Sequence, residues 1–403
     1  MANILVFNYQ IPYPEHFSGN TVRVLPLSRE ISKHHQLFLV CFGEKDERYH
    51  QLRTLKIFKD IHLVPAPKGR KSVFRHFYVK TGDQTRVSLP SEYRRIVRSL
   101  EDLIDLWSVD LILAHTSHLA EYVLPLSGIP KVMDAIDCNA LALSRMLSYK
   151  KGGKTEFFEL LKHRVALKRK RYLESGLSKR FDLVTVASKV DRDYLRMLSK
   201  VGQKRIIDVP NGINPTLLTI SVDNSNEFKN AIGFWGDLQF PPNKTAVYYF
   251  YDNVFSPFLS KQGVIWFIIG KNPTDRIKRM ARTDPNIRVT GFVENLFDFV
   301  SRIPIVINPM VIGGGIKNKV LEAFALRRLV ISNTRGIEAI EAKDGIHYVH
   351  AETPVEFSEK ILLYLSRGQE RKQIGQNAAS LVEQHYTWDK VGHRYTSLLN
   401  AVI

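Results

Sequence analysis

The sequence predicts an α/β protein built from two doubly wound, Rossmann-like domains. Short runs of β-branched and aromatic residues alternate with longer stretches of helical period, a pattern typical of βαβ units and parallel sheets. A length of 403 residues is typical of two or three domains, and 44% hydrophobic residues suffice to bury their cores. Two such domains facing a central cleft would bind a ligand at the carboxyl ends of their strands.

The first domain is expected over residues 1–215. Its strands are predicted from apolar runs at Ile4–Asn8, Leu37–Phe42, Ile61–Pro65, Leu111–His115, Lys131–Ala135, Leu183–Ala187 and Ile206–Val209. The stretches between these runs repeat apolar residues at helical spacing, which predicts helices at Val22–Lys33, Tyr93–Leu106, Glu156–Leu177 and Asp191–Leu198.

A polar stretch over residues 216–230 is predicted to be a linker, and the second domain is expected at residues 231–382. Its strands are predicted at Ala231–Gly236, Val264–Gly270, Ile287–Thr290, Ile305–Pro309 and Leu329–Ser332. Its helices are predicted at Thr245–Pro257, Thr274–Met280, Asn295–Val300 and Lys319–Ala325. The last stretch, residues 383–403, has a helical pattern of its own.

The chain is strongly basic, and the excess charge belongs to the first domain. Lys and Arg number 58 against 40 Asp and Glu, a net charge of +18. Residues 1–210 hold 36 basic and 22 acidic side chains (+14), which leaves 22 − 18 = +4 for the rest. The excess is densest at residues 68–98 and 150–171. Either stretch could be a solvated helix face, but together they favour attraction to an anionic membrane surface.

Nucleic acid would be attracted by the same charge. However, the sequence has no helix-turn-helix, aromatic ribonucleoprotein motif or zinc finger, so we expect no nucleic-acid partner.

The sequence also indicates the compartment. The two cysteines, Cys41 and Cys138, lack the paired spacing of a metal or redox site, and no metal is expected. The first residues resemble a strand rather than a signal peptide, and no apolar run reaches the roughly 18 residues that span a bilayer. We therefore expect a cytoplasmic protein, bound peripherally at the inner face of the cell membrane if the basic charge acts on lipid.

The most informative motif is a three-glycine turn, Gly313–Gly315, between an apolar strand and a helix. Glycines allow a ligand to approach the backbone closely, and the first N–H groups of a helix form an anion site. Lys317 and Lys319 would add mobile positive charge, and Glu322 could accept hydrogen bonds from a ribose. The motif therefore predicts a diphosphate site. The alternative is a plain turn with solvated lysines and a glutamate that only favours the helix N-terminus.

Polar residues also follow two strands of the first domain. His115 and His118 come at and just after the end of Leu111–His115, where they would face the cleft. Asp134 and Asp137 lie at the end of the next strand and could bind acceptor hydroxyls. Each of these side chains could instead be structural, the aspartates as loop caps.

Several motifs in a fixed order resemble the retaining GT-B glycosyltransferases of glycosyltransferase family 4. They are Pro12–Gly19, Val209–Asn214, Gly233–Gly236, Val289–Phe292, Glu322–Ala325, Thr334–Glu338 and His385–Trp388. A Gly-Xaa-Gly-Xaa-Lys-Xaa-Lys loop and the pair Pro242-Asn243 are most similar to a branch associated with exopolysaccharide assembly. In this family a C-terminal helix, here within residues 383–403, returns to the first domain.

The resemblance implies a retaining, metal-independent, hexosyltransferase-like enzyme with a nucleotide-diphosphate sugar as substrate and no cofactor. The acceptor would be a polysaccharide, glycan or lipid-linked sugar. His115, Lys317 and Glu322 would then be catalytic, and His118, Asp134 and Asp137 would lie on the acceptor side. The donor would be bound by Gly19, Gly236, Lys244, Gly313, Gly314, Gly315, Ile316, Lys317, Asn318, Lys319, Val320 and Glu322.

Two departures from the family pattern concern the donor. The family signature has two glutamates eight residues apart, but the earlier position is Gly314 here, so only Glu322 takes over a role. The stretch Gly236–Lys244 lacks the arginine that is usual in the family and offers only Lys244. A sugar-nucleotide epimerase of the same fold and a catalytically reduced nucleotide-sugar-binding protein are the alternative functions. A dehydrogenase is disfavoured because Asn8–Pro12 lacks the dinucleotide-binding glycines.

Overall fold

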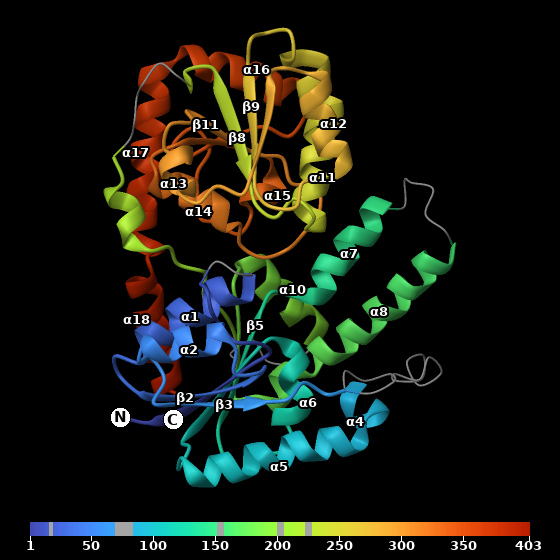
Figure 1. The fold of residues 1–403 in the computed structure, drawn as a ribbon, viewed down its shortest axis with the longest axis vertical. Coiled ribbons are helices and arrows are strands. Elements are labelled where there is room, and N and C mark those ends of the chain that lie inside the picture. Colours follow the sequence, from blue (N-terminus) through green and yellow to red (C-terminus); the bar gives the residue numbers. More distant parts are fainter. Residues whose placement is uncertain (16–18, 69–83, 151–156, 200–204, 222–227) are drawn as a thin grey trace. The chain divides into compact units, whose positions relative to one another are not determined.

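The computed structural model describes the chain except residues 16–18, 69–83, 151–156, 200–204 and 222–227. Parts of the two basic stretches and of the predicted linker therefore lie outside the described residues. The chain divides into two compact units (Figure 1). Unit 1 comprises Met1–Asn211 and Trp388–Ile403, and unit 2 comprises Gly212–Thr387.

Unit 1 is built around a parallel seven-stranded sheet of order β3-β2-β1-β4-β5-β6-β7. The strands are β1 (Asn3–Asn8), β2 (Gln36–Phe42), β3 (Asp60–Val64), β4 (Leu111–His115), β5 (Lys131–Ile136), β6 (Leu183–Val186) and β7 (Ile206–Asp208). Each begins and ends within one residue of its predicted bounds. The inner strands are largely continuous apolar runs, which are the local signature of strands buried on both faces.

Helices cover both faces of this sheet. Within β1, Leu5 and Phe7 belong to one buried cluster, and Ile4 and Val6 belong to the cluster on the opposite face. The covering helices are α1 (Gly19–Ile31), α2 (Glu47–Thr54), α4 (Gln84–Ser88), α5 (Pro90–Leu106), α6 (Ala120–Val123), α7 (Asn139–Lys150), α8 (Phe157–Ser175), α9 (Leu177–Arg180) and α10 (Lys189–Ser199), with a short 3₁₀ helix η1 (Ser117–Leu119).

The C-terminal helix α18 (Trp388–Asn400) also belongs to unit 1, where it packs against α1. Its buried side chains Trp388, Val391 and Tyr395 join the cluster that covers one face of the sheet. A Cβ at Gly392 would overlap the side chain of Glu30, so a glycine is needed for this close approach. The predicted helical stretch began at residue 383, whereas the chain enters α18 at Trp388.

Unit 2 contains a parallel six-stranded sheet of order β10-β9-β8-β11-β12-β13. Its strands are β8 (Ala231–Trp235), β9 (Ile265–Ile269), β10 (Ile287–Gly291), β11 (Ile305–Asn308), β12 (Leu329–Ser332) and β13 (Val349–His350). Its helices are η3 (Pro215–Thr219), α11 (Pro241–Phe250), the π-helix η5 (Tyr251–Leu259), α12 (Asp275–Thr283), α13 (Leu296–Val300), α14 (Asn318–Ala325), α15 (Thr334–Ile337), α16 (Pro354–Ser366) and α17 (Gly368–His385). The prediction of two doubly wound α/β domains is thus confirmed.

Candidate functional site

The strand order of each sheet reverses once, and this reversal fixes where a ligand can bind. In unit 2 the chain runs outward from β8 through β9 to β10 and then returns to β11 on the other side of β8. In unit 1 the reversal lies between β1 and β4. The loops after such neighbouring strands diverge, which leaves a crevice at their carboxyl ends. The predicted donor loops of unit 2 and His115 of unit 1 lie at these two points.

The glycine turn follows β11 after the four residues Pro309–Ile312. Gly313 and Gly315 have φ values of +113° and +65°, a region that side chains with a Cβ rarely adopt. The turn leads into α14, whose first residue is Asn318. The helix thus begins with its N-terminal N–H groups beside the turn, as an anion site requires. Of the other predicted residues here, Ile316 and Val320 are buried and Asn318 is half-buried.

Lys317 closes the glycine turn instead of standing free in solvent. Its Nζ donates hydrogen bonds to the carbonyl oxygens of Gly314 (2.7 Å) and Gly315 (2.8 Å), and only 9% of the residue is exposed. The prediction that this lysine is mobile is therefore wrong. The physical reason is that a turn without regular backbone pairing leaves carbonyl groups that need donors.

Lys319 is held as well. Its Nζ donates to Asn243 Oδ1 at 2.8 Å and lies 3.7 Å from the centroid of the Phe234 ring. Part of the residue is exposed, but the ammonium group is buried, and this burial lowers the pKa of Lys319 to about 7. The positive charge of Lys317 also lowers this pKa, whereas the negative charge of Glu322 raises it. The positive charge at this position therefore depends on pH in the physiological range.

Asn243 connects this lysine to the loop after β8. Its Nδ2 donates to the carbonyl oxygen of Asp237 at 3.0 Å. In the same loop Gly236 has a φ of +144°, and a Cβ there would come within 2.5 Å of Asn243 Nδ2. Lys244, the next residue along α11, is half-buried. The two loops at the reversal point are thus tied together by Lys319 and Asn243.

Glu322 lies in the second turn of α14, where its carboxylate faces β8. Its Oε2 accepts a hydrogen bond of 2.9 Å from Nε1 of Trp235, the last residue of that strand. The residue is half-buried. This position between the two strands of the reversal is compatible with the predicted contact to a ribose.

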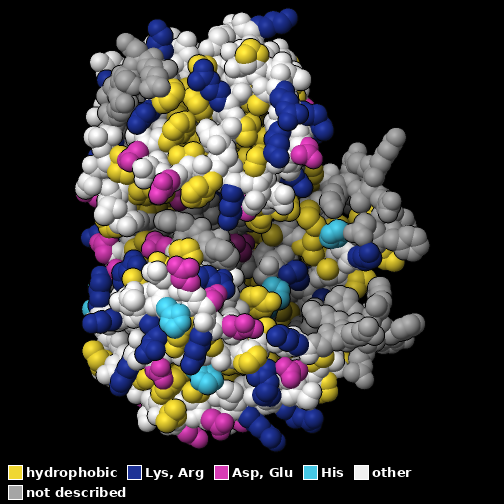
Figure 2. All heavy atoms as spheres, in the orientation of Figure 1, with side chains coloured by type: hydrophobic (Ala, Val, Ile, Leu, Met, Phe, Trp, Pro, Cys, Tyr) yellow, Lys and Arg dark blue, Asp and Glu magenta, His cyan; other side chains and the backbone are white. Residues whose placement is uncertain are grey.

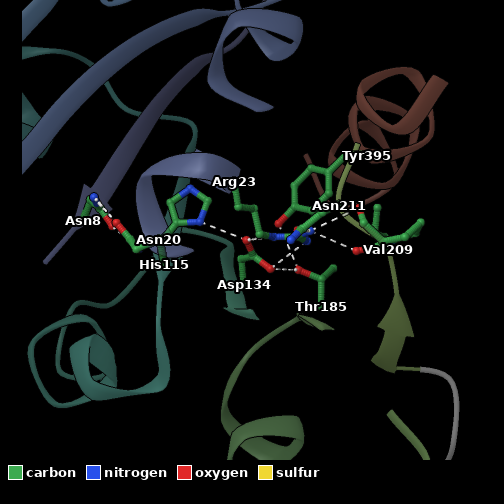
Figure 3. Close-up of polar contacts among 10 residues, drawn as sticks. Asn8, Asn20, Arg23, His115, Asp134, Thr185, Val209, Asn211 and Tyr395 are labelled. Atoms are coloured by element: carbon green, nitrogen blue, oxygen red, sulfur yellow. Dashed lines mark hydrogen bonds and ion pairs between the residues drawn. The ribbon is translucent and has the colours of Figure 1, made fainter. Parts of the chain in front are cut away.

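In unit 1, His115 ends β4 and is wholly buried (Figure 3). Its Nδ1 lies 2.9 Å from Asp134 Oδ2, and its Nε2 has no hydrogen-bond partner among the residues that the structure describes. On the other side of the ring, Asn8 at the end of β1 exchanges two hydrogen bonds of 3.0 Å with Asn20 of α1 (Figure 3).

Asp134 is wholly buried, so the prediction that it binds acceptor hydroxyls is corrected. Its oxygens accept hydrogen bonds from Arg23, His115 and Thr185 (Figure 3). Burial by itself would raise the pKa of Asp134, but the charge of Arg23 and the hydrogen bonds from His115 and Arg23 outweigh burial and lower the pKa well below its usual range. The carboxylate is therefore ionised and fully engaged with protein donors.

The other predicted residues of unit 1 lie nearer the surface. His118 is exposed in η1, and Asp137 is half-buried just after β5. Gly19 is exposed at the first position of α1, and a Cβ there would meet nothing within 4 Å. His118 and Asp137 are accessible from solvent, whereas Asp134 is not.

Sequence reasoning missed the residues that hold the predicted ones in place. They are Asn8, Asn20, Arg23, Thr185, Trp235, Asn243 and Tyr395. Trp235 and Asn243 lie within the motifs Gly233–Gly236 and Pro242-Asn243, which assigned no contact to either side chain. Among the others, Arg23 gave a local signal, because a single arginine between Val22 and Val24 interrupts an apolar stretch of a helix. Within the described part of the chain, no three or more His, Cys, Asp or Glu side chains gather where they could hold a metal ion. No described helix combines the length and the apolar character needed to cross a membrane.

Comparison with known proteins gives three kinds of similarity. Residues 229–367 match the family described as "Glycosyl transferases group 1", so unit 2 carries such a domain. An uncharacterised 44.6 kDa protein of the cps region of Klebsiella pneumoniae is 27% identical over 172 residues. That match covers 35% of this chain and 43% of the relative, so less than half of the relative's length is spanned.

The third similarity is to solved structures over the whole chain. Sucrose-phosphate synthase of Thermosynechococcus elongatus is 13% identical, with a TM-score of 0.71 and coverage of 100% of this chain and 99% of that one. HepE of Anabaena, solved in complex with UDP and glucose, is 12% identical, with a TM-score of 0.66 and full coverage of both chains. Identities this low show the fold alone, and that fold is GT-B.

Proposed function

We propose that this chain, which has the GT-B fold and a glycosyl transferases group 1 domain, moves a sugar from a nucleotide-diphosphate sugar to a glycan or lipid-linked acceptor with retention of configuration. The observation that carries the proposal is the glycine turn at the reversal point of unit 2, with two lysines and Glu322 around it. The complex of HepE with UDP and glucose supports a donor of this class.

The diphosphate would lie against Gly313–Gly315 and the first turn of α14. The positive φ values at Gly313 and Gly315 favour glycine, so no side chain covers the backbone at these two positions. The helix dipole favours an anion there. Lys317 already holds its charge within the turn, at 2.7 Å from Gly314 O. Preorganised cations and N–H groups of this kind can stabilise a leaving diphosphate without a metal ion.

The ribose would lie at Glu322. Trp235 fixes one carboxylate oxygen, so the side chain is held in one orientation before the nucleotide arrives. A carboxylate that is fixed in advance loses less conformational entropy when it accepts hydrogen bonds from a ribose diol.

In the transfer step, the bond between the anomeric carbon and the β-phosphate oxygen breaks while the acceptor oxygen bonds to the same face of the carbon. The hydroxyl proton of the acceptor passes to the departing phosphate oxygen, so charge and atoms balance. The anomeric carbon becomes oxocarbenium-like between these events, and the growing charge on the diphosphate needs the cations of unit 2. Lys317 and Lys319 are the residues we assign to this task.

His115 would contact the donor sugar. Because Asp134 is ionised, Nδ1 of a neutral His115 imidazole would carry the hydrogen between them, and Nε2 would then accept a hydrogen bond from a sugar hydroxyl. The ring is wholly buried in this structure, so a sugar reaches Nε2 only when the chain around the ring moves. His118 and Asp137 would bind the acceptor.

We further propose that unit 1 associates with an anionic membrane through α7 and α8. Lys162, Arg164 and Lys168 of α8 are exposed, and so are Leu161 and the Tyr149 side chain of α7. Figure 2 shows hydrophobic and basic side chains together on this part of the surface. Anionic lipids attract basic residues, and exposed apolar side chains can enter the interface. The relative from a cps region supports a role in polysaccharide biosynthesis.

The proposal is tested by transfer and hydrolysis assays with a panel of nucleotide sugars, UDP-glucose first. We expect one donor to raise the melting temperature of the wild type, because it binds only the folded state. Glu322→Ala and Lys317→Ala should both weaken that shift, and exposed Lys261→Ala should not. Full donor binding by both site variants would refute the site. Epimerised donor without acceptor, or binding without any turnover, would refute the transferase.

A further inference from the structure

Arg23 of α1 is wholly buried, and its guanidinium joins several separate segments of unit 1. Nε and Nη2 donate to the two oxygens of Asp134 on β5 at 2.8 and 3.0 Å. Nη1 donates to the carbonyl oxygens of Val209 (3.0 Å) and Pro210 (3.2 Å) and to Asn211 Oδ1 (2.9 Å). These contacts use the three nitrogens of one planar group, a geometry that lysine cannot reproduce.

Asp134 connects Arg23 to His115 at the end of β4. Its Oδ2 accepts from both Arg23 Nε and His115 Nδ1. Its Oδ1 accepts from Arg23 Nη2 and from the hydroxyl of Thr185 at 2.9 Å. Four donors therefore fix the carboxylate, and the carboxylate in turn fixes the imidazole of His115 with its proton on Nδ1.

The same network reaches the segment with which the chain leaves unit 1 and the helix with which it returns. Asn211 is the last residue of unit 1 before the chain enters unit 2. Tyr395 lies on α18, the helix with which the chain returns. The Tyr395 hydroxyl is 3.0 Å from Thr185 Oγ1, and because that oxygen already donates to Asp134, Tyr395 must be the donor (Figure 3). One ion pair thus contacts His115 and Val209–Asn211 directly and reaches α18 through Thr185.

Stability alone is a weak reason for such an arrangement. A buried ion pair is often no more stabilising than apolar residues of the same volume, because both charges lose their hydration. A fixed hydrogen-bond pattern, in contrast, is something that apolar side chains cannot provide.

We propose that Arg23 is a positioning residue for sugar transfer. It acts through Asp134 to fix the tautomer and orientation of His115, and through Val209–Asn211 to fix the connecting segment to that same histidine. The proposal rests on the function assigned above to His115, but Arg23 itself never touches a substrate.

The first test is spectroscopic and needs no substrate. In protein labelled with ¹⁵N-histidine at pH 8, His115 of the wild type should be a single Nδ1–H tautomer, assigned by its loss in His115→Asn. In Arg23→Met and in Asp134→Asn this single tautomer should be replaced by a mixture. Arg29→Met, an exposed position on the same helix, is the matched control. An unchanged His115 tautomer in both network variants would overturn the proposal.

The second test separates positioning from binding. With the donor identified, kcat should fall about 100-fold in Arg23→Met, the effect of a small misplacement of a reacting group, while the nucleotide Kd stays unchanged because unit 2 binds the nucleotide. Arg23→Lys keeps the charge and should recover part of kcat, which also covers the case in which Arg23→Met does not fold. Wild-type kcat in Arg23→Lys and in a folded Arg23→Met would refute the proposal. Lack of turnover in the wild type would instead count against the proposed function, and the tautomer test would still stand.

Discussion

The indole nitrogen of Trp235 and the carboxylate of Glu322 are joined by a hydrogen bond of 2.9 Å, although 87 positions separate the two residues in the chain. Trp235 ends β8, and Glu322 belongs to the helix that follows β11. The bond therefore spans the point at which the strand order of unit 2 reverses. It fixes the one acidic residue that the sequence assigns to the ribose.

This bond predicts a difference between two substitutions. Glu322→Gln removes the charge that a ribose diol would contact, and we expect the nucleotide-sugar Kd to rise about tenfold, or about 1.4 kcal/mol. Trp235→Phe keeps the carboxylate but frees its orientation, so the rise should be smaller. Glu370→Gln, at an exposed surface pair with Arg367, is the control. Calorimetric titration measures all three, and equal affinity of Glu322→Gln and wild type would contradict the ribose assignment.

Lys319 predicts that donor binding takes up a proton. Burial lowers the pKa of Lys319 to about 7, so at pH 8 most of this side chain is the uncharged amine in the free protein. A bound diphosphate would raise that pKa again, because a neighbouring negative charge favours the charged form. We expect uptake close to one proton per nucleotide sugar at pH 8 and almost none at pH 6.

Titration calorimetry in two buffers of different ionisation enthalpy measures this uptake. A nucleotide sugar is the better probe, because a free terminal phosphate titrates near pH 6 itself. Lys319→Met should abolish the uptake, and exposed Lys261→Met should leave it intact. Buffer-independent heats for the wild type at pH 8 would show that Lys319 does not meet the diphosphate.

Asp134 predicts how the stability of unit 1 depends on pH. Its pKa in the folded protein lies well below the unfolded value of about 3.9, so its contribution is fully present above that pH and is lost as the pH falls below it. Asp134→Asn leaves Arg23 buried without a counter-charge and should cost about 3–5 kcal/mol near neutral pH. The melting temperatures of variant and wild type should converge below about pH 4. A gap that stays constant down to pH 3 would argue against an ionised Asp134.

The surface of α8 predicts salt-dependent binding to anionic vesicles. Each basic residue near such a surface contributes about 1 kcal/mol. The triple charge reversal of Lys162, Arg164 and Lys168 to Glu should therefore weaken binding at least 100-fold. Co-sedimentation with phosphatidylserine vesicles measures the loss. The matched control reverses three exposed charges of unit 2, Lys261, Arg279 and Arg282. Binding that resists salt, or that falls only in the control, would place the contact elsewhere.

Local sequence patterns were sufficient to predict most strands and the glycine turn of this protein. Strands such as β4 and β11 are continuous apolar runs, which can be predicted from the local sequence alone. The glycine turn was equally visible, because only glycine adopts the φ of +113° at position 313 without strain. Helix α7 was missed, since Asn139–Lys150 packs on α8 and lacks a clear polar face.

The tertiary structure decided what the polar residues do. From the sequence, Lys317 and Lys319 are mobile cations and Asp134 is a ligand for the acceptor, yet all three are held by protein groups. The partners of Asp134 and Arg23 lie up to 188 positions away along the chain. Spacing in the sequence carries no information on such contacts, because they form only when the strands have paired and the helices have packed on the sheet. The sequence alone determined the two-domain α/β architecture and the place of the proposed anion site, and the packing of that architecture decided which charges remain for a ligand.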